Sequence, residues 1–312
     1  MSKSIFSALH FNDEAAAYAY VEARLWEDGR TCPHCGVVDR SGPLKGKTSR
    51  PGMYKCYACR KTFTVKIGTI FEDSHIAMRD WLTAIHLICS SKKGISSNQL
   101  HRTLGITLKS AWFLSHRIRE AMGEATASED AGPLGGKNKV VEADETYVGG
   151  KAKNRKNHVP PKEIVLSLVE RGGKVHSKHV ADVTGATLHD AMVNQINEAS
   201  YLMTDEAPVY RTIGDEFEGH GTVNHSAEEY VRAYFWHTNT VEGFFSILKR
   251  GVMGTYHHIS AAHLHRYLKE FDFRYNQRIA LGIDDTARSE KALRRVVGKR
   301  LTYRTTNREV TA

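Results

Sequence analysis

The sequence lacks any apolar run close to the roughly 20 residues that a membrane-spanning helix needs. The nearest candidate is Trp81–Cys89, which His86 interrupts. The opening stretch MSKSIFSALHFNDE has no apolar centre of the kind found in secretion signals, and it soon becomes acidic. We therefore expect a cytoplasmic protein, neither membrane-spanning nor secreted, whose thiols are reduced.

Acidic residues are too few to balance the basic ones. The 312 residues include 44 Lys and Arg but only 35 Asp and Glu, which gives a formal net charge of +9. Such an excess indicates a polyanionic partner, and it favours nucleic acid over a membrane surface. Charge alone does not indicate a fold, but the length leaves room for roughly two or three domains, with a sizeable core in one of them.

Cysteine is scarce, yet four of the five cysteines form two C-x-x-C pairs. Cys32 and Cys35 make the first pair, and Cys56 and Cys59 make the second, with 20 residues between them. Four thiolates on two tight turns can form a closed tetrahedral Zn²⁺ site, and this spacing is typical of a zinc ribbon. A disulfide pair is not expected in a reducing compartment. Cys89 lies in an apolar helical run and is predicted to be a core residue.

Basic residues flank the second cysteine pair. Arg60, Lys61 and Lys66 would give the ribbon a positively charged edge that could contact phosphates. An ordinary solvated edge is the alternative interpretation.

Helical patterns follow the ribbon. Residues 78–91 carry an amphipathic stripe, and two further helices are expected over 96–104 and 107–122. A tight glycine-containing turn joins the last two, which is typical of a helix-turn-helix, although plain packing units share this pattern. The second helix is the candidate DNA-recognition helix, with basic residues Lys109, Arg117 and Arg119.

The pattern changes again after residue 122. Residues 123–138 are rich in Gly, Ala and acidic side chains, show no apolar period and are predicted to form a linker. Strand-like patterns begin beyond it. The expected elements are strands over 139–148, 163–170, 174–182, 201–204 and 221–225, a helix over 187–199 and a long helix over 236–250. This order predicts an α/β domain with a mixed sheet.

Three acidic residues are placed to converge in that domain. Asp144 lies in the middle of the first strand, Asp205 ends the fourth, and Glu242 lies near the start of the long helix. A charged residue on a strand face that meets a helix is costly unless it binds something. Three such oxygen ligands suit Mg²⁺ or Mn²⁺, and two of these ions can support an in-line phosphoryl displacement. Asp205 could instead cap a helix that starts near Pro208.

The long helix carries a polar face. At helical spacing, Asn239, Glu242, Ser246 and Lys249 fall on one side of it. A carboxylate followed two turns later by a cation suits a site that holds a metal and a phosphate together. Asn239 and Glu242 also fit a capping box, and basic residues in a last turn can complement the helix dipole. Both interpretations stay open at this point.

Together these motifs resemble DDE-type transposases of bacterial insertion sequences, in the group related to the eukaryotic Merlin elements. The matching stretches are the ribbon over 32–59, VEADETYVGGK at 141–151, LMTDEAPVY at 202–210, HTNTVEGFFSILKRGVMGTYHH at 237–258 and HLHRYLKEFDFRYNQR at 263–278. The last two stretches are the specific ones. The resemblance implies a ribonuclease-H-like catalytic domain whose first two acids are Asp144 and Asp205.

The third metal ligand of the resembling group is either Glu or Asn. Glu242, with Lys249 seven residues later, is the expected ligand, and Asn239 is the alternative. The resemblance implies that the protein nicks transposon ends with water as nucleophile. The released 3′-hydroxyl then attacks target DNA by transesterification. The implied partners are double-stranded DNA ends and target, with a homo-oligomer assembled on the DNA in the nucleoid.

The expected organisation is a helix and zinc ribbon over 1–70, a helix-turn-helix over 71–122, a linker over 123–138, a catalytic domain over 139–283 and a basic C-terminal tail over 284–312. Further DNA contacts are expected from a basic loop after the first acid and from the end of the long helix, through Lys151, Lys153, Arg155, Lys249 and Arg250. Two other functions remain open. One is a DNA-binding regulator whose acids are relics, and the other is a ribonuclease-H-like nuclease that cuts branched DNA.

Overall fold

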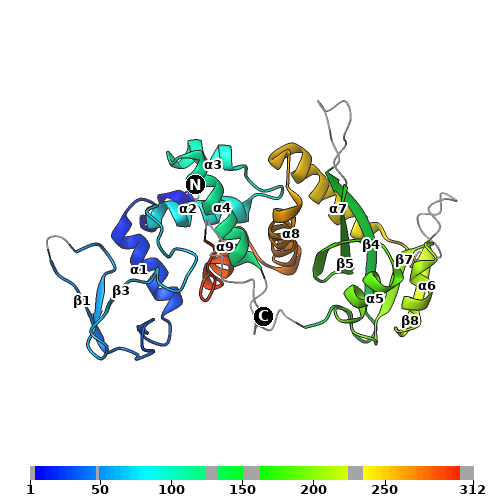
Figure 1. Cartoon of the computed structure of the whole chain (residues 1–312), viewed down its shortest axis with the longest axis horizontal. Helices are drawn as coiled ribbons and strands as arrows, with labels where there is room; N and C mark the ends of the chain where they lie inside the picture. Colours follow the sequence, from blue (N-terminus) through cyan, green and yellow to red (C-terminus); the bar gives the residue numbers. More distant parts are fainter. Residues whose placement is uncertain (1–3, 47–48, 124–131, 150–161, 224–234, 303–312) are drawn as a thin grey trace, which may run out of the picture. The chain divides into compact units, whose positions relative to one another are not determined.

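The computed structural model describes residues 4–46, 49–123, 132–149, 162–223 and 235–302 (Figure 1). The chain divides into two compact units. The first comprises Met1–Ser91, Ile95–Met122 and Asp284–Ala312, and the second comprises Lys92–Gly94 and Gly123–Ile283. None of the helices in the described ranges has the length and apolarity that crossing a membrane requires.

The first unit begins with a helix and a small sheet. Helix α1 (Glu14–Leu25) is capped by Asp13, whose Oδ1 accepts a hydrogen bond of 2.7 Å from the Ala16 N–H. The sheet is antiparallel in the order β1-β2-β3, with strands Ser41–Pro43, Tyr54–Cys56 and Thr62–Phe63. Aromatic rings of Trp26, Tyr54 and Phe63 pack under it. Short 3₁₀ turns (Ile5–Ser7 and Leu9–Phe11) precede α1.

Four helices complete this unit: α2 (Met78–Ser90), α3 (Ser97–Leu104), α4 (Leu108–Met122) and α9 (Asp285–Arg294). Helix α3 starts at Ser96, whose Oγ accepts from the Gln99 N–H at 3.2 Å. It ends at Gly105, whose φ of 65° reverses the chain before α4. Cys89 is buried in α2, as its apolar surroundings predict.

The basic segment over 284–312 begins with a packed helix. Helix α9 contacts α1, α2 and α4, and its Ala292 and Leu293 are buried. The Arg288 guanidinium donates a 2.8 Å hydrogen bond to the carbonyl of Cys89 in α2. The amphipathic pattern of this helix is hard to recognise in the sequence, because basic residues surround an apolar face that is only two or three residues wide.

Two arginines of α4 are not available for DNA. Arg117 is 6% exposed and donates to the carbonyls of Ile70, Glu72 and Leu301 at 2.8, 2.7 and 3.1 Å. Arg119 is 1% exposed and donates to the Ser115 hydroxyl. A guanidinium carries five N–H donors, so one buried arginine can satisfy several carbonyls that would otherwise lack a partner. Of the three basic residues of α4 predicted to contact DNA, only Lys109, in the first turn, is exposed.

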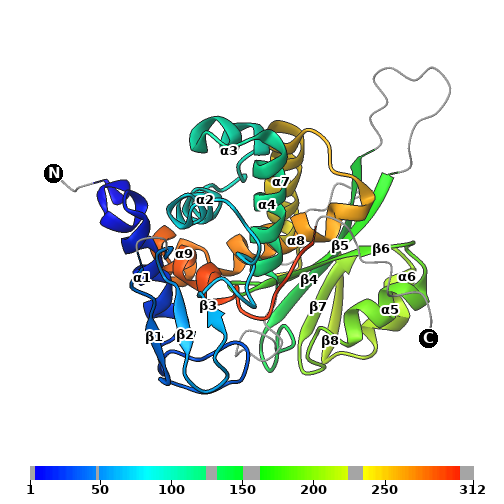
Figure 2. The same cartoon turned by 60° about the vertical axis from the view of Figure 1, so that its left-hand side comes forward.

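The second unit is built on a five-stranded sheet in the order β6-β5-β4-β7-β8 (Figure 2). Its strands are β4 (Val140–Gly149), β5 (Lys162–Glu170), β6 (Val175–Val180), β7 (Tyr201–Asp205) and β8 (Gly219–Val223). The first three form an antiparallel meander, whereas β7 and β8 run parallel to β4. The predicted mixed sheet is confirmed.

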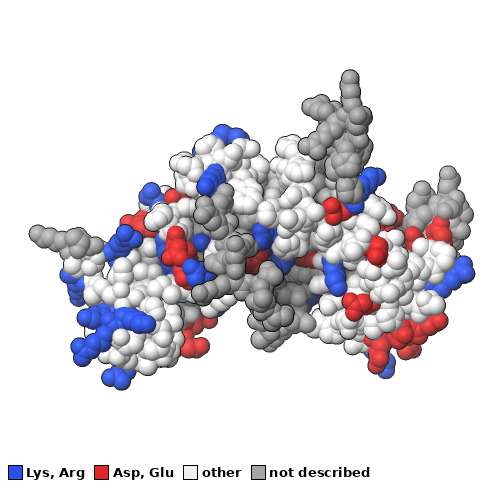
Figure 3. Space-filling view, in the orientation of Figure 1, with Lys and Arg blue, Asp and Glu red and all other residues white. Residues whose placement is uncertain are grey.

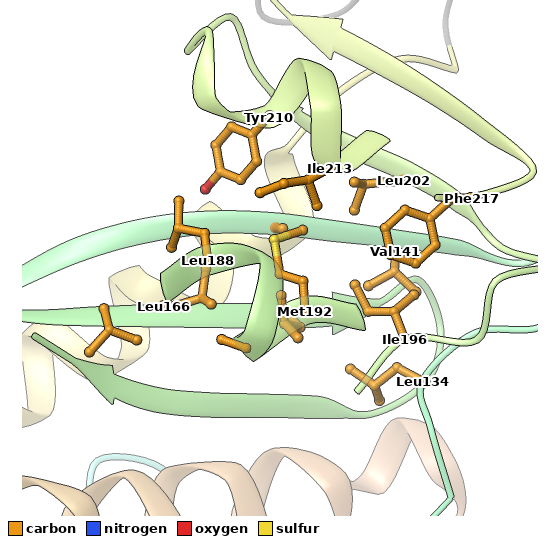
Figure 4. Packing of buried hydrophobic residues seen from close by; sticks show 14 residues of the cluster. Leu134, Val141, Leu166, Leu188, Met192, Ile196, Leu202, Tyr210, Ile213 and Phe217 are labelled. Carbon is orange, nitrogen blue, oxygen red and sulfur yellow. The ribbon is translucent and has the colours of Figure 1, made fainter. Parts of the chain in front are cut away.

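Helices cover both faces of this sheet. On one face, α5 (Gly185–Val193) and α6 (Val209–Gly214) pack over Val141, Leu166 and Leu202 (Figure 4). On the other face, α7 (Asn239–Gly251) and α8 (Ala261–Asn276) pack over alternate residues such as Val165 and Val169. A π-helical turn (Val252–Tyr256) follows α7, and a 3₁₀ turn (Ile279–Leu281) follows α8. Because side chains alternate along β4, Glu142, Asp144 and Thr146 face α7.

Part of the predicted linker belongs to the core of this unit. Leu134 is 5% exposed and packs with the α5 cluster, and its backbone exchanges hydrogen bonds with Gln195 and Asn197. The linker prediction is therefore wrong for residues 132–138, and residues 124–131 lie outside the described part of the chain. A single leucine among glycines gives no apolar periodicity, so the sequence pattern could not predict that this segment is buried.

The buried position of Arg117 leads to a testable prediction. Arg117→Ala leaves three carbonyls without their donor and should lower the free energy of unfolding by about 2–4 kcal/mol. Lys109→Ala, on the exposed side of the same helix, should change it by less than about 0.5 kcal/mol. Urea unfolding of the full chain measures both. Equal stabilities of the two variants would contradict the assignment of Arg117 to the core.

Candidate functional site

The four paired cysteines form a ready-made metal site in the ribbon. Their Sγ atoms all lie within 4.8 Å of one another, with 3.8 Å between Cys32 and Cys59 and 3.7 Å between Cys35 and Cys56. A tetrahedral Zn²⁺ with Zn–S bonds of 2.3 Å has sulfur–sulfur edges of about 3.8 Å. The geometry therefore fits zinc. Within the described ranges, no other group of three or more His, Cys, Asp or Glu residues brings its ligand atoms this close.

The cysteine cluster is also electrostatically suited to a cation. Backbone N–H groups of Cys59 and Ala58 lower the pKa of the Cys56 thiol to about 6. For Cys35, the neighbouring thiols and desolvation outweigh the hydrogen bond from the Val37 backbone, and its pKa rises to about 11. Four thiols held this close cannot all ionise without a positive charge among them, so metal binding would displace protons.

The ribbon has a basic surface. Figure 3 shows Lys and Arg side chains gathered over it. The exposed basic residues of this region are Arg40, Lys45, Arg50, Lys55, Arg60 and Lys61. Lys66, predicted to belong to the same edge, is half-buried, and its ammonium donates to the carbonyls of Ser74 and Ile76. Lys66 is therefore a structural residue.

In the second unit, the sheet brings the two predicted aspartates to one place. Strands β4 and β7 are parallel, with Val140 paired to Tyr201 and Glu142 to Met203. Asp144 and Asp205 each lie two residues beyond the last of these pairs, so continuing the register brings them to neighbouring positions, and the charge of Asp205 acts on Asp144. The two aspartates are 61 residues apart in the sequence, yet they lie on adjacent strands.

An open pocket of about 800 Å³ lies next to these positions. It is lined by Asp144, Glu145 and Thr146 of β4, by Glu242, Phe245, Ser246, Lys249 and Arg250 of α7, by Met253 and Gly254, and by Lys93. Three of the four residues predicted to share one face of the long helix therefore meet in this pocket. The exception is Asn239, which is exposed and does not line it. Asp205 lies outside the lining as well, and its Oδ1 accepts a 3.0 Å hydrogen bond from the Ala207 N–H.

The carboxyl of Asp144 is strongly perturbed. Burial, together with the negative charges of Glu145, Asp205 and Glu242, raises the pKa of Asp144 to about 7, against one opposing hydrogen bond of 2.7 Å from the Glu145 N–H. The three predicted ligands are thus within electrostatic reach of each other, although their oxygens do not all lie within 4.8 Å. Such mutual repulsion is what a divalent cation relieves.

Glu145 has a different environment from Asp144. Its carboxylate accepts a hydrogen bond from the Tyr210 hydroxyl of α6, on the opposite face of the sheet. Burial raises the pKa of Glu145. Glu145 and Asp144 point to opposite faces of the sheet because side chains alternate along a strand. The contact with Tyr210 assigns Glu145 to the packing of α6 rather than to the predicted ligand set.

A fourth acid, Glu142, determines where α7 begins. It is completely buried, and its carboxylate accepts hydrogen bonds from Arg171 Nε at 2.6 Å, from the Thr240 N–H and hydroxyl at 2.7 and 2.8 Å, and from the Val241 N–H at 3.0 Å. Arg171 also donates to the carbonyls of Phe235 and His237, just before the helix. Glu142 thereby satisfies N–H groups that a helix start leaves unpaired.

This contact overturns the capping-box interpretation of Asn239. The helix is preceded by Thr238, without a side-chain cap, and Asn239 is its first residue. The N–H groups of Thr240 and Val241 donate instead to the carboxylate of Glu142 on β4. A capping box is a local pattern, and here a residue 98 positions away in the chain takes over that role.

Lys249 and Arg250 line the pocket from the last turn of α7, where both are exposed. Arg250 Nε donates to the Ser246 carbonyl at 3.0 Å. The predicted basic loop with Lys151, Lys153 and Arg155 lies outside the described residues. Lys93 was not predicted, because one lysine in the turn between α2 and α3 carries no motif.

The first unit thus holds a four-cysteine cluster, and the second holds, on a mixed sheet, a pocket lined by both carboxylates and cations. Two family models match the chain: a transposase zinc-ribbon domain over residues 12–62 and an ISXO2-like transposase domain over residues 133–276. The chain is also 26% identical over 269 residues to a protein in transposable element ISH50 of Halobacterium salinarum, itself uncharacterized. That match covers 80% of this chain and 86% of the relative. The resemblance of the chain to insertion-sequence transposases is confirmed.

The cysteine geometry predicts one zinc ion per chain. Cys56→Ser removes one of four ligands and should release the ion and unfold the ribbon, because folding of such small modules depends on the metal. Cys89→Ala removes a thiol away from the cluster and should retain the ion. Metal analysis of protein purified under reducing conditions measures both. Wild-type protein without zinc, or zinc retained by Cys56→Ser, would disprove the assignment.

The Glu142 contacts generate a second prediction for this region. Glu142→Gln removes the buried charge that Arg171 and the helix N–H groups share, so the free energy of unfolding should fall by about 3 kcal/mol. Glu163→Gln is the matched control. Its carboxylate accepts a 2.7 Å hydrogen bond from His179 at a partly exposed position, where a loss below about 1 kcal/mol is expected. Chemical unfolding compares them, and equal losses would show that Glu142 is not specially placed.

Proposed function

We propose that the protein is a transposase that binds the ends of its insertion sequence and carries out metal-dependent DNA cleavage and strand transfer. The observation that carries this proposal is the convergence of Asp144, Asp205 and Glu242 beside one pocket, where burial and the charges of the other two acids raise the pKa of Asp144. The transposase domain that matches residues 133–276 supports the same activity. The mixed sheet with helices on both faces is consistent with a ribonuclease-H-like fold.

The metal ligands in this proposal are the three acids. Asp144, Asp205 and Glu242 would hold Mg²⁺ or Mn²⁺, which supplies Lewis-acid polarisation of the scissile phosphate and activation of the attacking water or 3′-hydroxyl. A carboxyl with a pKa near 7 retains a proton at lower pH, so Asp144 must release it when it becomes a ligand. Lys249 and Arg250 would hold neighbouring phosphates.

Glu242 is the better candidate for the third ligand. It lines the pocket, and its charge acts on Asp144, whereas Asn239 is exposed outside the pocket lining. A carboxylate also supplies charge to a hard divalent ion, which the neutral carbonyl of an amide does not. Asn239 would then act only on the local conformation at the start of α7.

End recognition is assigned to the first unit. Its zinc ribbon has a basic surface, and Lys109 is exposed at the start of α4, in the position where a recognition helix contacts bases. Arg117 and Arg119 are excluded from this role by their burial. Because two transposon ends must be brought together, we propose that the active form is a homo-oligomer assembled on DNA.

The deciding experiment is in-vitro strand transfer with Mg²⁺, using duplexes made from the DNA that flanks the gene. Glu242→Gln should lower strand transfer by more than about 100-fold, because it removes a metal ligand. Asn239→Ala should reduce it only in part. End binding and zinc content serve as controls and should not change in either variant.

Three other outcomes of this assay are informative. An active Glu242→Gln beside an inactive Asn239→Ala would reverse the ligand assignment. Cutting without joining would indicate a nuclease instead of a transposase. End binding by a wild-type protein that neither cuts nor joins would indicate a DNA-binding regulator.

A further inference from the structure

The pocket beside Asp144 includes a cation from a distant part of the sequence. Lys93 lines it together with Lys249 and Arg250, and the segment Lys92–Gly94 belongs to the second unit even though the residues on either side belong to the first. Lys93 is exposed, and its ammonium forms no hydrogen bond or ion pair with any residue in the described ranges. The neighbouring Lys92 is equally exposed but does not line the pocket.

The backbone of this segment is closely fitted to the end of α7. Gly94 has a φ of 85°, and a Cβ at this residue would lie 1.7 Å from the Tyr256 hydroxyl. A Cβ on Gly251, the last residue of α7, would lie 3.0 Å from the Lys93 carbonyl oxygen. Each glycine therefore permits an approach that a side chain would prevent. The close fit holds Lys93 at the edge of the pocket.

The surface against which Gly94 packs is itself held by buried charges. Glu270 is completely buried in α8, and its carboxylate accepts hydrogen bonds from the Tyr256 hydroxyl and from Arg274. The Tyr256 ring packs edge-on against Tyr267, with 4.7 Å between ring centroids. Tyr256 also ends the π-helical turn that follows α7, so one network supports both this turn and the Lys93 segment.

The pocket is divided between two kinds of charge. Asp144 and Glu242 lie toward β4 and the start of α7, whereas Lys249, two turns further along the helix, is about 10 Å away at a rise of 1.5 Å per residue. Thr146, also in the lining, is 2% exposed, and its hydroxyl has no hydrogen-bond partner among the described residues. Carboxylates suit metal ions, while separate cations and a free hydroxyl suit an anion that extends beyond the metals.

We propose that Lys93 is a phosphate-binding residue of this site and contacts the sugar–phosphate backbone of the DNA strand whose reacting phosphate lies at Asp144 and Glu242. The inference rests on the proposed function and adds a residue and a contact to it. The ligand is a chain of phosphodiesters, because Lys249, another cation of the pocket, lies about 10 Å along α7 from Glu242, which is too far for one phosphate to contact both. A lysine that only faced solvent would not require its backbone to pack so closely against Gly251 and Tyr256.

The salt dependence of DNA binding tests this contact directly. The full chain, its zinc bound and without added Mg²⁺, is titrated against a labelled duplex that ends at the transposon terminus. Each phosphate contact contributes about 0.9 to the slope of log affinity against log salt concentration. Lys93→Ala should therefore lower the slope by about one, whereas Lys93→Arg should preserve it. Lys92→Ala, one residue away and outside the pocket, should leave the slope unchanged.

The outcomes separate this inference from the proposed function. An unchanged slope in Lys93→Ala, or an equal decrease in Lys92→Ala, would overturn the Lys93 contact while wild-type strand transfer with Mg²⁺ still supported the transposase. If the wild-type protein bound the duplex but neither cut nor joined it, the proposed function would fail. Even in that case, a slope that is lowered in Lys93→Ala but not in Lys92→Ala would establish that Lys93 contacts the DNA backbone.

Discussion

The position of α7 depends on one buried carboxylate. Glu142 on β4 accepts hydrogen bonds from the first N–H groups of the helix, while Arg171 connects the same carboxylate to the carbonyls just before it. Asp144 lies two residues further along the same strand face, and Glu242 lies in the first turn of the helix so held. One ionic contact in the interior therefore determines the distance between two of the proposed metal ligands.

This arrangement contains two kinds of acidic residue, those with a structural role and those proposed as metal ligands. Glu142 and Glu270 are buried but each is paired with an arginine and further donors, which offsets the cost of removing a charge from water. Asp144 is largely buried and faces other negative charges, and both effects raise its pKa to about 7, although one backbone hydrogen bond opposes them. A carboxyl left in this state is destabilising for a fold, and the compensation expected for it is a cation.

Much of the site was predictable because its signals are local. The spacing of the two C-x-x-C pairs predicts which cysteines could bind a metal ion. The change from a helical to a strand periodicity of apolar residues marks the start of the mixed sheet. Asp144 and Glu242 were predictable for a related reason. Each is an acidic residue inside an element that also carries an apolar pattern, so it is noticeable in the sequence alone. The register of β4 and β7 then brings Asp205 to Asp144, as the predicted order of strands requires.

The sequence by itself therefore determined most of the elements and identified the cysteines and acids as candidate metal ligands, because periodicity and spacing are properties of short stretches. Only the tertiary structure decided which charged residues are paired. Arg117 and Lys109 look alike on one helix, yet Arg117 meets three carbonyls from elsewhere in the chain and Lys109 remains exposed. The burial of Leu134, the packing of α9 and the position of Lys93 were missed for the same physical reason. Burial, pairing and pocket lining depend on partners distant in sequence, and no local pattern records them.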